Sequence, residues 1–354
     1  MELQTLGFSN WFKQCQKELN KPDHSIARIT AVNKGSYLVR NEHSEVLSEL
    51  AGEFSFSADS IIKYPVVGDW AFVQYYNDNT FAIIYDLFPR KTILRRKTAG
   101  KKVDYQIIAS NIDVAFIVQS CDSNFNLRRL ERYLVMVNDS HIKPVILLSK
   151  SDLVSQEDLE SNTSEIRNTG IKCKTIAYSI KTGLGLFEIE QVLKPGMTYC
   201  LLGSSGVGKT TLLNRLIGRD AFKTKLVREK DGKGRHATSR RQLVVLDQGA
   251  MLIDTPGMRE LGTIGVKSGI EESFLDILRL SEDCRFKDCT HTREDGCSVL
   301  EAVQSGDISE SYYQSFLKLR KESEHYQMSY IAKRRKDRKF GQFIKSVMKQ
   351  NKKK

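Results

Sequence analysis

From residue 25 to about residue 95, apolar and polar positions alternate in short stretches separated by turn-forming residues. The stretches are SIARITAV, GSYLVRN, EVLSELAGEF, VVGDWAFVQYY and TFAIIYDLF, with Asn77-Asp78-Asn79 before the last. A period of two residues is typical of strands, so this region is predicted to form a small β-barrel. An oligonucleotide-binding (OB) fold is the natural candidate because its open face presents aromatic and basic residues to nucleic acid. Strand content alone also allows a closed sandwich.

The pattern changes after a predicted linker that runs from Pro89 through the basic residues up to Lys102. Apolar strands then alternate with amphipathic helices, which predicts a parallel sheet covered by helices. The predicted strands are DVAFIVQS, PVILL, TIAYS and MTYCLL. The clearest predicted helices run from about Asn126 to Val137 and along the segment that carries Leu212, Leu213, Leu216 and Ile217 and stops at Gly218. A hairpin, QLVVLDQGAMLIDTPG, is predicted to turn at Gln248-Gly249.

Membrane and secretion signals are missing from the sequence. No stretch reaches the roughly 18 uninterrupted apolar residues of a membrane span, and MELQTLGFSNWFKQ lacks a basic region followed by an apolar one. The seven cysteines are odd in number and mostly scattered, which disfavours a disulfide framework. We therefore expect a cytoplasmic protein with reduced thiols and no membrane association and, in the absence of a competing interface signal, a monomer.

The formal net charge of +12 and the pI near 9.2 favour a polyanionic partner. Lysines and arginines that neutralise phosphates release condensed counterions, which drives such binding. The excess is concentrated between Arg95 and Lys102 and again between Lys333 and Lys354. A solvated helix face or tail would give the same runs, so charge alone does not identify the partner.

The segment GSSGVGKT matches the phosphate-binding pattern G-x-x-x-x-G-K-[ST] and lies between a predicted strand and a predicted helix. The glycines let backbone N–H groups point at phosphates, Lys209 reaches the β- and γ-phosphates, and the Thr210 hydroxyl holds Mg²⁺. The strand and helix on either side argue against the alternative, a simple glycine-rich turn. The predicted nucleotide contacts of this loop are Gly203, Ser204, Ser205, Gly206, Val207, Gly208, Lys209, Thr210 and Thr211.

A second phosphate-site motif, D-x-x-G, is formed by Asp254 and Gly257 at the end of the predicted hairpin. At this distance from a P-loop, Asp254 can support Mg²⁺ through water, and the Gly257 N–H can sense a γ-phosphate. The polar segment REKDGKGRHATSRRQ between the two motifs has the composition of a switch loop. Thr238 is its candidate hydroxyl for Mg²⁺, so the predicted magnesium ligands are Thr210, Thr238 and Asp254.

Ser149-Lys150-Ser151-Asp152 directly follows PVILL and corresponds to the guanine-reading motif N-K-x-D. Asp152 can accept hydrogen bonds from guanine N1–H and its amino group, whereas adenine would leave the carboxylate unpaired. The stem of Lys150 can cover the base. Alone, such a segment is more often a helix-entry turn capped by Ser151 or Asp152. Ser179, after the next strand, resembles a second base-contacting loop and favours the guanine site.

Both base loops precede the P-loop, whereas they follow it in ordinary small GTPases. The order of base loops, P-loop, switch one and switch two is therefore a circular permutation. Because the second switch then leads directly into the C-terminal region, nucleotide state can be passed to whatever that region contacts.

Four metal-binding residues cluster near the C-terminus as C-x4-C-x-H-x5-C: Cys284, Cys289, His291 and Cys297. Three thiolates and one imidazole suit a closed, tetrahedral structural zinc site. The alternative, three core cysteines and a surface histidine, conflicts with the polar sequence DCRFKDCTHTREDGC. We predict a multidomain α/β protein with an OB barrel and N-terminal extension (1–95), a permuted P-loop GTPase domain (96–265) and a helical zinc domain with a basic tail (266–354).

These residues resemble the family of ribosome-small-subunit-dependent GTPases called RsgA or YjeQ. The resemblance covers nearly the whole chain and rests on VVGDW, IIASNID, NFNLRRLERYL, GRHATS, DTPGMREL, the permuted motifs, the cysteine cluster and the basic tail. It implies a GTPase that binds the small ribosomal subunit, including its 16S rRNA, late in maturation and is stimulated by it.

The sequence departs from common GTPase patterns at two positions. The family usually has asparagine where this chain has Ser149, and the shorter hydroxyl should lose contacts to the base and to the P-loop. Met258 stands where many GTPases have a water-orienting glutamine, although the resemblance implies an apolar residue there. It also implies that His236 is the polar group needed for hydrolysis, while a solvent-facing loop histidine fits the sequence equally.

The leading hypothesis is an Mg²⁺-dependent GTP hydrolase with one structural Zn²⁺ that acts in small-subunit assembly. Its predicted catalytic residues are Lys209, Thr238, His236 and Gly257. An RNA-binding scaffold with a degraded nucleotide site is one alternative, motivated by Ser149 and Met258. A P-loop ATPase is another, and Asp152 argues against it.

Overall fold

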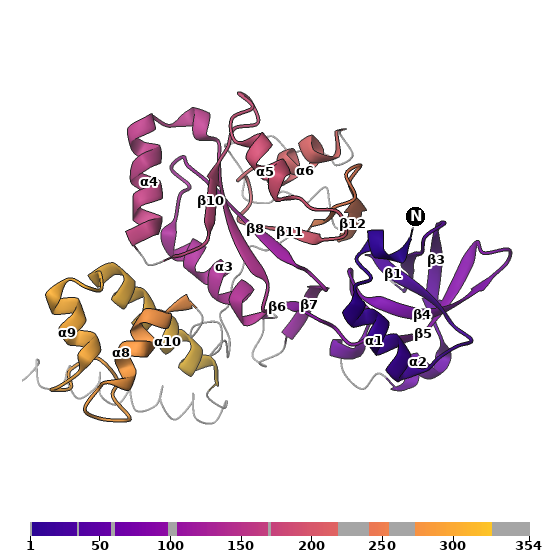
Figure 1. Cartoon of the computed structure of the whole chain (residues 1–354), viewed down its shortest axis with the longest axis horizontal. Helices are drawn as coiled ribbons and strands as arrows, with labels where there is room; N and C mark the ends of the chain where they lie inside the picture. Colours follow the sequence, from indigo (N-terminus) through magenta and orange to yellow (C-terminus); the bar gives the residue numbers. More distant parts are fainter. Residues whose placement is uncertain are drawn as a thin grey trace, which may run out of the picture. The chain divides into compact units, whose positions relative to one another are not determined.

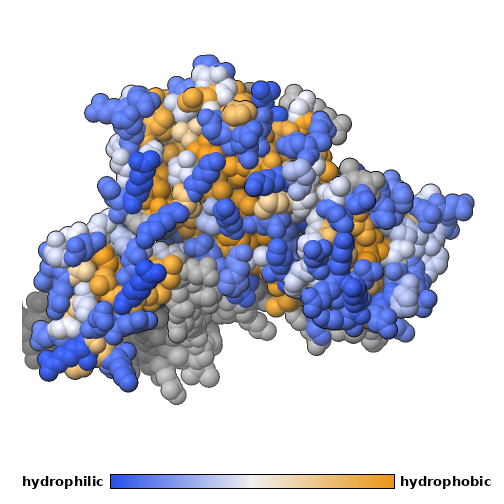
Figure 2. Space-filling model, in the orientation of Figure 1, coloured by the Kyte–Doolittle hydropathy of each residue, from blue (hydrophilic) through white to orange (hydrophobic). Residues whose placement is uncertain are grey.

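The computed structural model describes residues 2–33, 35–57, 61–97, 105–168, 171–218, 241–254 and 273–327. Its contacts divide the chain into two compact units, Met1–Leu261 and Gly262–Lys354, and each unit is described by itself. In the described residues, no helix is both long and apolar enough to cross a bilayer. Hydrophilic residues cover much of the face seen in Figure 2.

A closed five-stranded barrel forms the beginning of the first unit. Its neighbouring strands follow the order β1-β2-β3-β5-β4, and the β1–β4 pairing closes it. The strands are β1 (Ser25–Val32), β2 (Tyr37–Arg40), β3 (Glu45–Leu50), β4 (Trp70–Tyr76) and β5 (Phe81–Leu87). Side chains such as Ile29, Val39 and Ile84 fill the interior. The alternating pattern thus predicted the barrel correctly, except that EVLSELAGEF does not remain extended: helix α2 (Gly52–Ser57) and the 3-10 helix η2 (Ile61–Lys63) follow β3.

The N-terminal segment packs against this barrel through aromatic residues. It contains the 3-10 helix η1 (Leu3–Leu6) and helix α1 (Asn10–Leu19), neither of which the sequence pattern had predicted. Phe8 meets Trp70 edge-on at 4.8 Å between ring centroids, and Phe12 lies 5.9 Å from the same ring. The segment is therefore held by tertiary burial of a few rings and not by a long amphipathic repeat.

The rest of the first unit is a sheet in which five strands run parallel, in the order β10-β9-β8-β11-β13. These are β8 (Val114–Ser120), β9 (Lys143–Ser149), β10 (Lys174–Ala177), β11 (Thr198–Leu202) and β13 (Met251–Asp254). Strand β12 (Gln242–Val245) pairs antiparallel with β13 through the predicted hairpin. The carboxyl ends of the five parallel strands lie at one edge of the sheet, where α/β proteins bind ligands.

Helices cover both faces of this sheet (Figure 1). Helices α3 (Leu127–Asp139) and α4 (Gln156–Asn168) contribute to the cluster on one face, and α5 (Leu186–Val192) and α6 (Lys209–Ile217) to the cluster on the other. In α3, the apolar positions repeat at helical spacing, and the Asn126 side chain caps the first turn by accepting from Arg129 N. Alternate strand residues such as Ile117 and Val118 fill opposite faces.

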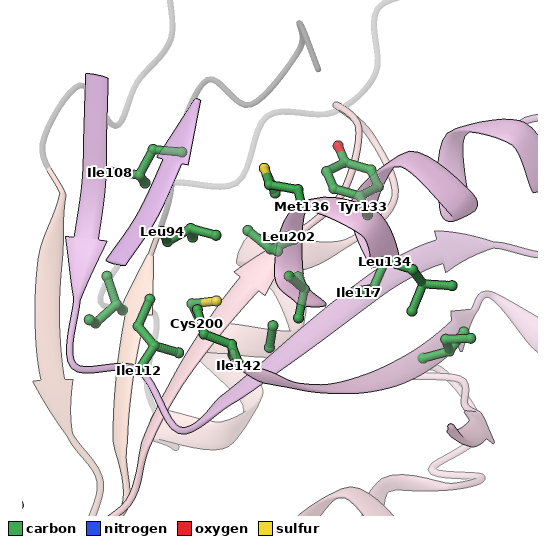
Figure 3. Close-up of a cluster of buried hydrophobic side chains, with 14 of the residues drawn as sticks. Leu94, Ile108, Ile112, Ile117, Tyr133, Leu134, Met136, Ile142, Cys200 and Leu202 are labelled. Atoms are coloured by element: carbon green, nitrogen blue, oxygen red, sulfur yellow. The ribbon is translucent and has the colours of Figure 1, made fainter. Parts of the chain in front are cut away.

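The predicted linker from Pro89 to Lys102 is wrong over most of its described length. Strand β6 (Ile93–Lys97) pairs antiparallel with β7 (Tyr105–Ser110). Leu94 is fully buried, and Figure 3 shows it with Ile108 in the cluster that also contains Tyr133, Met136 and Cys200. Three of the five residues of β6 are basic, which obscured the strand pattern. Lys101 and Lys102 lie outside the described residues.

A buried arginine joins the barrel to the parallel sheet. Arg28 on β1 is 1% exposed and donates hydrogen bonds to Leu6 O, to Asn111 O at 3.3 Å and to Thr198 Oγ1 at 2.8 Å. Its guanidinium also lies 5.5 Å from the Trp70 ring. Burial lowers its pKa to about 10, which still leaves it charged at neutral pH. Next to it, β1 pairs with β12 at Ala31↔Gln242, so the two sheets are continuous.

The second unit consists of the helices α8 (Leu275–Glu282), α9 (Ser298–Ser305) and α10 (Glu310–Gln327) in its described part. The rings of Phe274 and Tyr312 stack at 4.9 Å, and Phe316 lies 5.6 Å from Phe274. These ring contacts pack the start of α8 against α10. The cysteine cluster lies between α8 and α9 in the sequence.

We predict that Arg28→Met lowers the free energy of unfolding by about 2–3 kcal/mol, because the buried carbonyls of Leu6 and Asn111 lose their donor. Denaturant unfolding of the full chain measures this. The control is Arg40→Met, at the half-buried position that faces Arg28 across the β1–β2 pair. It should change stability by no more than about 0.5 kcal/mol. Equal losses in the two variants would show that Arg28 has no special role.

Candidate functional site

The two predicted base loops lie against each other at the ends of β9 and β10. Ser149 ends β9, Lys150 takes a left-handed backbone conformation (φ 58°), and Asp152 follows in a short 3-10 turn. The Ser179 hydroxyl donates to Asp152 Oδ1 at 2.6 Å. This contact holds one carboxylate oxygen and leaves the exposed side chain able to accept from a base. Ser151 N also donates to Tyr178 O at 3.2 Å.

The P-loop connects β11 to α6, as its sequence context predicted. Gly203, Gly206 and Gly208 have φ values of 148°, 82° and 94°, which residues with a Cβ rarely adopt. A Cβ on Gly203 would lie 2.4 Å from Val118 O, so the loop passes too close to β8 for any side chain there. The turn leaves the first N–H groups of α6 available to an anion.

Lys209, the first residue of α6, points back into this loop. Its Nζ donates to Gly203 O at 2.8 Å and to Ser204 O at 2.6 Å. Burial lowers the pKa of Lys209 to about 8, while the negative charge of Asp254 opposes that shift. The ammonium group is therefore held among carbonyl dipoles, a weaker environment than the phosphates it is suited to bind.

Ser149 joins the base loop to the P-loop, contrary to the expectation that the short hydroxyl would lose this contact. Its Oγ lies 2.7 Å from Val207 O and 3.2 Å from Gln119 O, with the hydroxyl as donor. The side chain reaches because β9, β8 and β11 are adjacent and in parallel register. The P-loop contact of the motif's first residue is thus retained, with a hydroxyl in place of an amide.

Two predicted magnesium ligands lie at the same edge of the sheet. Asp254 ends β13, is 4% exposed, and interacts electrostatically with Lys209. Thr210 follows Lys209 in the first turn of α6. A hydroxyl and a carboxylate beside the phosphate loop are the oxygen ligands that Mg²⁺ prefers, so these residues fit the ion. Thr238, His236, Gly257 and Met258 lie outside the described residues.

The structure brings the three cysteines and the histidine of the second unit together. The four ligand atoms lie within 4.8 Å of one another. Cys284 Sγ lies 3.9 Å from Cys297 Sγ, and His291 Nδ1 lies 3.5 Å from each of these sulfurs. Tetrahedral zinc with Zn–S bonds of about 2.3 Å and a Zn–N bond of about 2.0–2.1 Å separates sulfurs by roughly 3.8 Å and sulfur from nitrogen by about 3.5 Å. The cluster therefore fits a structural zinc site.

The orientation of His291 is set by its backbone. Its φ is 58°, and its carbonyl accepts a hydrogen bond of 2.6 Å from the Tyr313 hydroxyl on α10. The cluster is therefore linked directly to α10, and a zinc ion bound there would help to stabilise this small helical unit.

Comparison with known proteins identifies the class of this site. A model of the RsgA GTPase family matches residues 87–264. The chain belongs to the RsgA GTPase family. It is 39% identical over 349 residues to small ribosomal subunit biogenesis GTPase RsgA 1 of Bacteroides thetaiotaomicron, covering 98% of this chain and 97% of the relative. It is 41% identical to RsgA 2 of Lactiplantibacillus plantarum, covering 87% and 86% of the two chains.

Solved structures give the same result for the fold. The crystal structure of YjeQ from Thermotoga maritima matches with a TM-score of 0.63 and 25% identity, covering 83% of this chain and 96% of that one. The structure of YloQ, described as a circularly permuted GTPase, matches with a TM-score of 0.62 and 22% identity over 88% of this chain. The permuted order, the GTP-hydrolysing activity and the use of Mg²⁺ with GTP are thereby confirmed for this RsgA-family protein.

Sequence reasoning missed two residues that support the base loop. Asp122 accepts a hydrogen bond of 2.9 Å from Lys150 Nζ, and the backbone carbonyl of Gln119 lies 3.2 Å from the Ser149 hydroxyl. Burial opposes ionisation of Asp122, but the hydrogen bond from Lys150, those from Ser120 and Asn124 N, and the charge of Lys150 lower its pKa overall. Their position was the available signal: both lie at the carboxyl end of the first parallel strand, the edge where ligands bind.

We predict that GDP binds more weakly as the pH rises above about 8. Phosphate charge favours the ammonium form, so Lys209 has a higher pKa in the complex than in the free protein, where it is about 8. Above that pH the free protein must take up a proton to bind, and affinity should fall by up to about tenfold per pH unit. Titration calorimetry from about pH 7 to 9.5 measures it. Lys209→Met should bind weakly without this slope, and a flat wild-type profile would contradict the prediction.

We also predict one zinc ion per chain and its loss in Cys289→Ser, because three ligands hold the ion far less tightly than four. Elemental analysis of the purified full chain measures the metal, and thermal unfolding should show a less stable second unit. Cys173→Ser, which alters a partly exposed cysteine far from the cluster in the sequence, is the control and should keep its zinc. Zinc retained at full stoichiometry in Cys289→Ser would rule out this ligand set.

Proposed function

We propose that this RsgA-family GTPase binds the small ribosomal subunit late in its maturation and hydrolyses GTP there, with the subunit accelerating hydrolysis. The observation that carries the proposal is the direct contact between the base loop and the P-loop through Ser149 and Val207. A guanine-reading loop fastened to a phosphate-binding loop can bind one nucleotide at both ends. The small subunit is the partner in the names of relatives that align over nearly their full length, which supports the second half of the proposal.

Guanine recognition is assigned to Asp152, whose exposed carboxylate can accept hydrogen bonds from N1–H and the exocyclic amino group. Ser179 orients that carboxylate. Lys150 is tethered by Asp122, so its aliphatic stem is fixed where it can cover one face of the base.

Phosphate binding is assigned to the segment from Gly203 to Thr211. Lys209 exchanges the carbonyls of Gly203 and Ser204 for the β- and γ-phosphates, and the amides of the loop donate to the same anion. Bound Mg²⁺ neutralises charge on the phosphates, and Thr210 and Asp254 would hold it. We assign Thr238 to the magnesium site, Gly257 to sensing the γ-phosphate and His236 to the attacking water.

Coupling to the ribosome follows from the permuted order. We propose three parts: residues 1–95 and the basic C-terminal part of residues 266–354 contact rRNA, and residues 96–265 bind nucleotide. The D-x-x-G segment at Asp254 leads directly toward the zinc-binding part in the sequence. A nucleotide-dependent rearrangement of switch two can therefore change the affinity of that part for RNA. We further propose that the protein acts as a monomer in the cytoplasm, independent of membranes.

The scaffold alternative drew its support from Ser149, and the retained bond to Val207 removes much of that support. The ATPase alternative is disfavoured because an adenine would leave Asp152 without donors.

Phosphate release from GTP, measured with and without purified small ribosomal subunits, tests the proposal. We expect strong stimulation with GTP and little release from ATP. Asp152→Asn should lower guanine-dependent turnover at least about tenfold, since an amide cannot accept from both guanine donors. The control Asp158→Asn changes an exposed carboxylate on the neighbouring helix α4 and should retain activity.

Each unfavourable outcome has a separate meaning. If small subunits do not stimulate hydrolysis, the proposal that they are the partner is wrong. If ATP and GTP are turned over equally, the assignment of the base loop to guanine is wrong. Equal activity of the two aspartate variants would exclude Asp152 from the site.

A further inference from the structure

Tyr178 lies at the end of β10, immediately before Ser179, and is completely buried. Its ring belongs to the apolar cluster that contains Val207 of the P-loop and Leu212 of α6. Its hydroxyl, however, has no hydrogen-bond partner of good geometry among the described residues. A buried, unpaired hydroxyl costs free energy that phenylalanine at this position would avoid. Filling the core therefore does not account for a tyrosine here.

Tyr178 lies beside Ser149, because its N–H donates to Leu148 O at 2.8 Å and its carbonyl accepts from Ser151 N at 3.2 Å, the residues on either side of Ser149. The effect of the Ser149 side chain on the pKa of Tyr178 agrees with this neighbourhood. Burial raises the pKa of Tyr178, so the phenol stays protonated and remains a donor at physiological pH. Ser149 has one proton, which it can donate to only one acceptor at a time, and Val207 O at 2.7 Å is nearer than Gln119 O at 3.2 Å. Its oxygen lone pairs remain available to a donor such as the phenol. The two hydroxyls thus form a potential chain from β10 to the P-loop.

The sizes of the side chains at positions 149 and 178 are complementary. Asparagine, the usual first residue of N-K-x-D, is longer than serine and carries two polar groups. Serine therefore leaves more room in the buried cluster that Tyr178 shares with Val207 of the P-loop. The backbone of Tyr178 is fixed at the same place, because its N–H donates to Leu148 O at 2.8 Å and its carbonyl accepts from Ser151 N.

We propose that Ser149 and Tyr178 together replace the single asparagine of the guanine-reading motif, with Tyr178 acting as a positioning residue that sets guanine preference. Ser149 fastens the loop to Val207, and the Tyr178 hydroxyl supplies the second polar contact that serine cannot make. Asp152 depends on this arrangement because it lies in the same loop and is held by Ser179, the residue next to Tyr178. The inference rests on the proposed guanine site.

The test compares the affinities of fluorescent mant-GDP and mant-ADP for the full-length protein. Tyr178→Phe removes one hydroxyl and keeps the ring, so we expect GDP affinity to fall roughly three- to tenfold, while weak ADP binding stays the same. Tyr199→Phe is the matched control: Tyr199 is equally buried in the same cluster, but its hydroxyl donates to Val192 O at 2.6 Å. It should lower the melting temperature and leave the GDP/ADP ratio unchanged.

A second pair of variants tests the exchange of size. Ser149→Asn alone should weaken GDP binding, because the larger amide meets the Tyr178 side chain. Adding Tyr178→Thr to Ser149→Asn should restore GDP affinity, since the shorter side chain makes room for the amide. Such rescue is not expected if Tyr178 merely fills the core, because Tyr178→Thr would then cause further loss through a cavity.

Three outcomes distinguish the possibilities. An unchanged GDP/ADP ratio in Tyr178→Phe, or tighter GDP binding by Ser149→Asn with Tyr178 intact, would overturn the role of Tyr178. Failure of the double variant to recover would overturn the exchange of size. Equal binding of GDP and ADP by the wild-type protein would instead overturn the guanine site itself.

Discussion

Parallel pairing sends the carboxyl ends of β8, β9, β10, β11 and β13 to one edge of the sheet, and every described part of the nucleotide site depends on this constraint. Each strand end supplies one component. Asp122 follows β8, the loop of Ser149 and Asp152 follows β9, Ser179 follows β10, the P-loop follows β11, and Asp254 ends β13. Strand register therefore sets the distances between residues that are far apart in the sequence.

The circular permutation changes the order of these components in the sequence, but all of them still lie at the same edge of the sheet. A parallel strand pairs with its neighbour regardless of which is synthesised first, so the base loops can precede the P-loop and still touch it through Ser149. What changes is the connectivity to other parts of the chain. The strand that ends at Asp254 now leads toward the zinc-binding unit, and β12 beside it pairs with the barrel through Ala31. The candidate nucleotide site is thus joined to the barrel and to the zinc-binding unit by short stretches of chain.

Local patterns predicted some elements well and failed where burial was decided by distant partners. Helix α3 was predictable because its apolar positions repeat at helical spacing over 13 residues, and the strand before the P-loop because it is a continuous, mostly apolar run. Helix α1 was not, since its stability comes from rings such as Trp70 on another strand. Strand β6 looked like a linker because three of its five residues are basic, although Leu94 enters a core that α3 and β11 also line. Propensity is a weak guide when tertiary packing supplies most of the free energy.

By itself, the sequence determined the chemistry of this protein: the glycines and Lys209 of the P-loop, Asp152 after an apolar strand, and three cysteines with one histidine at zinc-binding spacing. These motifs are local, and their residue types suit few other ligands. The tertiary structure alone decided which residues meet. It showed that Ser149 still reaches the P-loop, that the buried Tyr178 lies next to Ser149, and that Arg28 joins barrel to sheet. Such contacts depend on strand register and side-chain length across long sequence separations, and no local pattern encodes them.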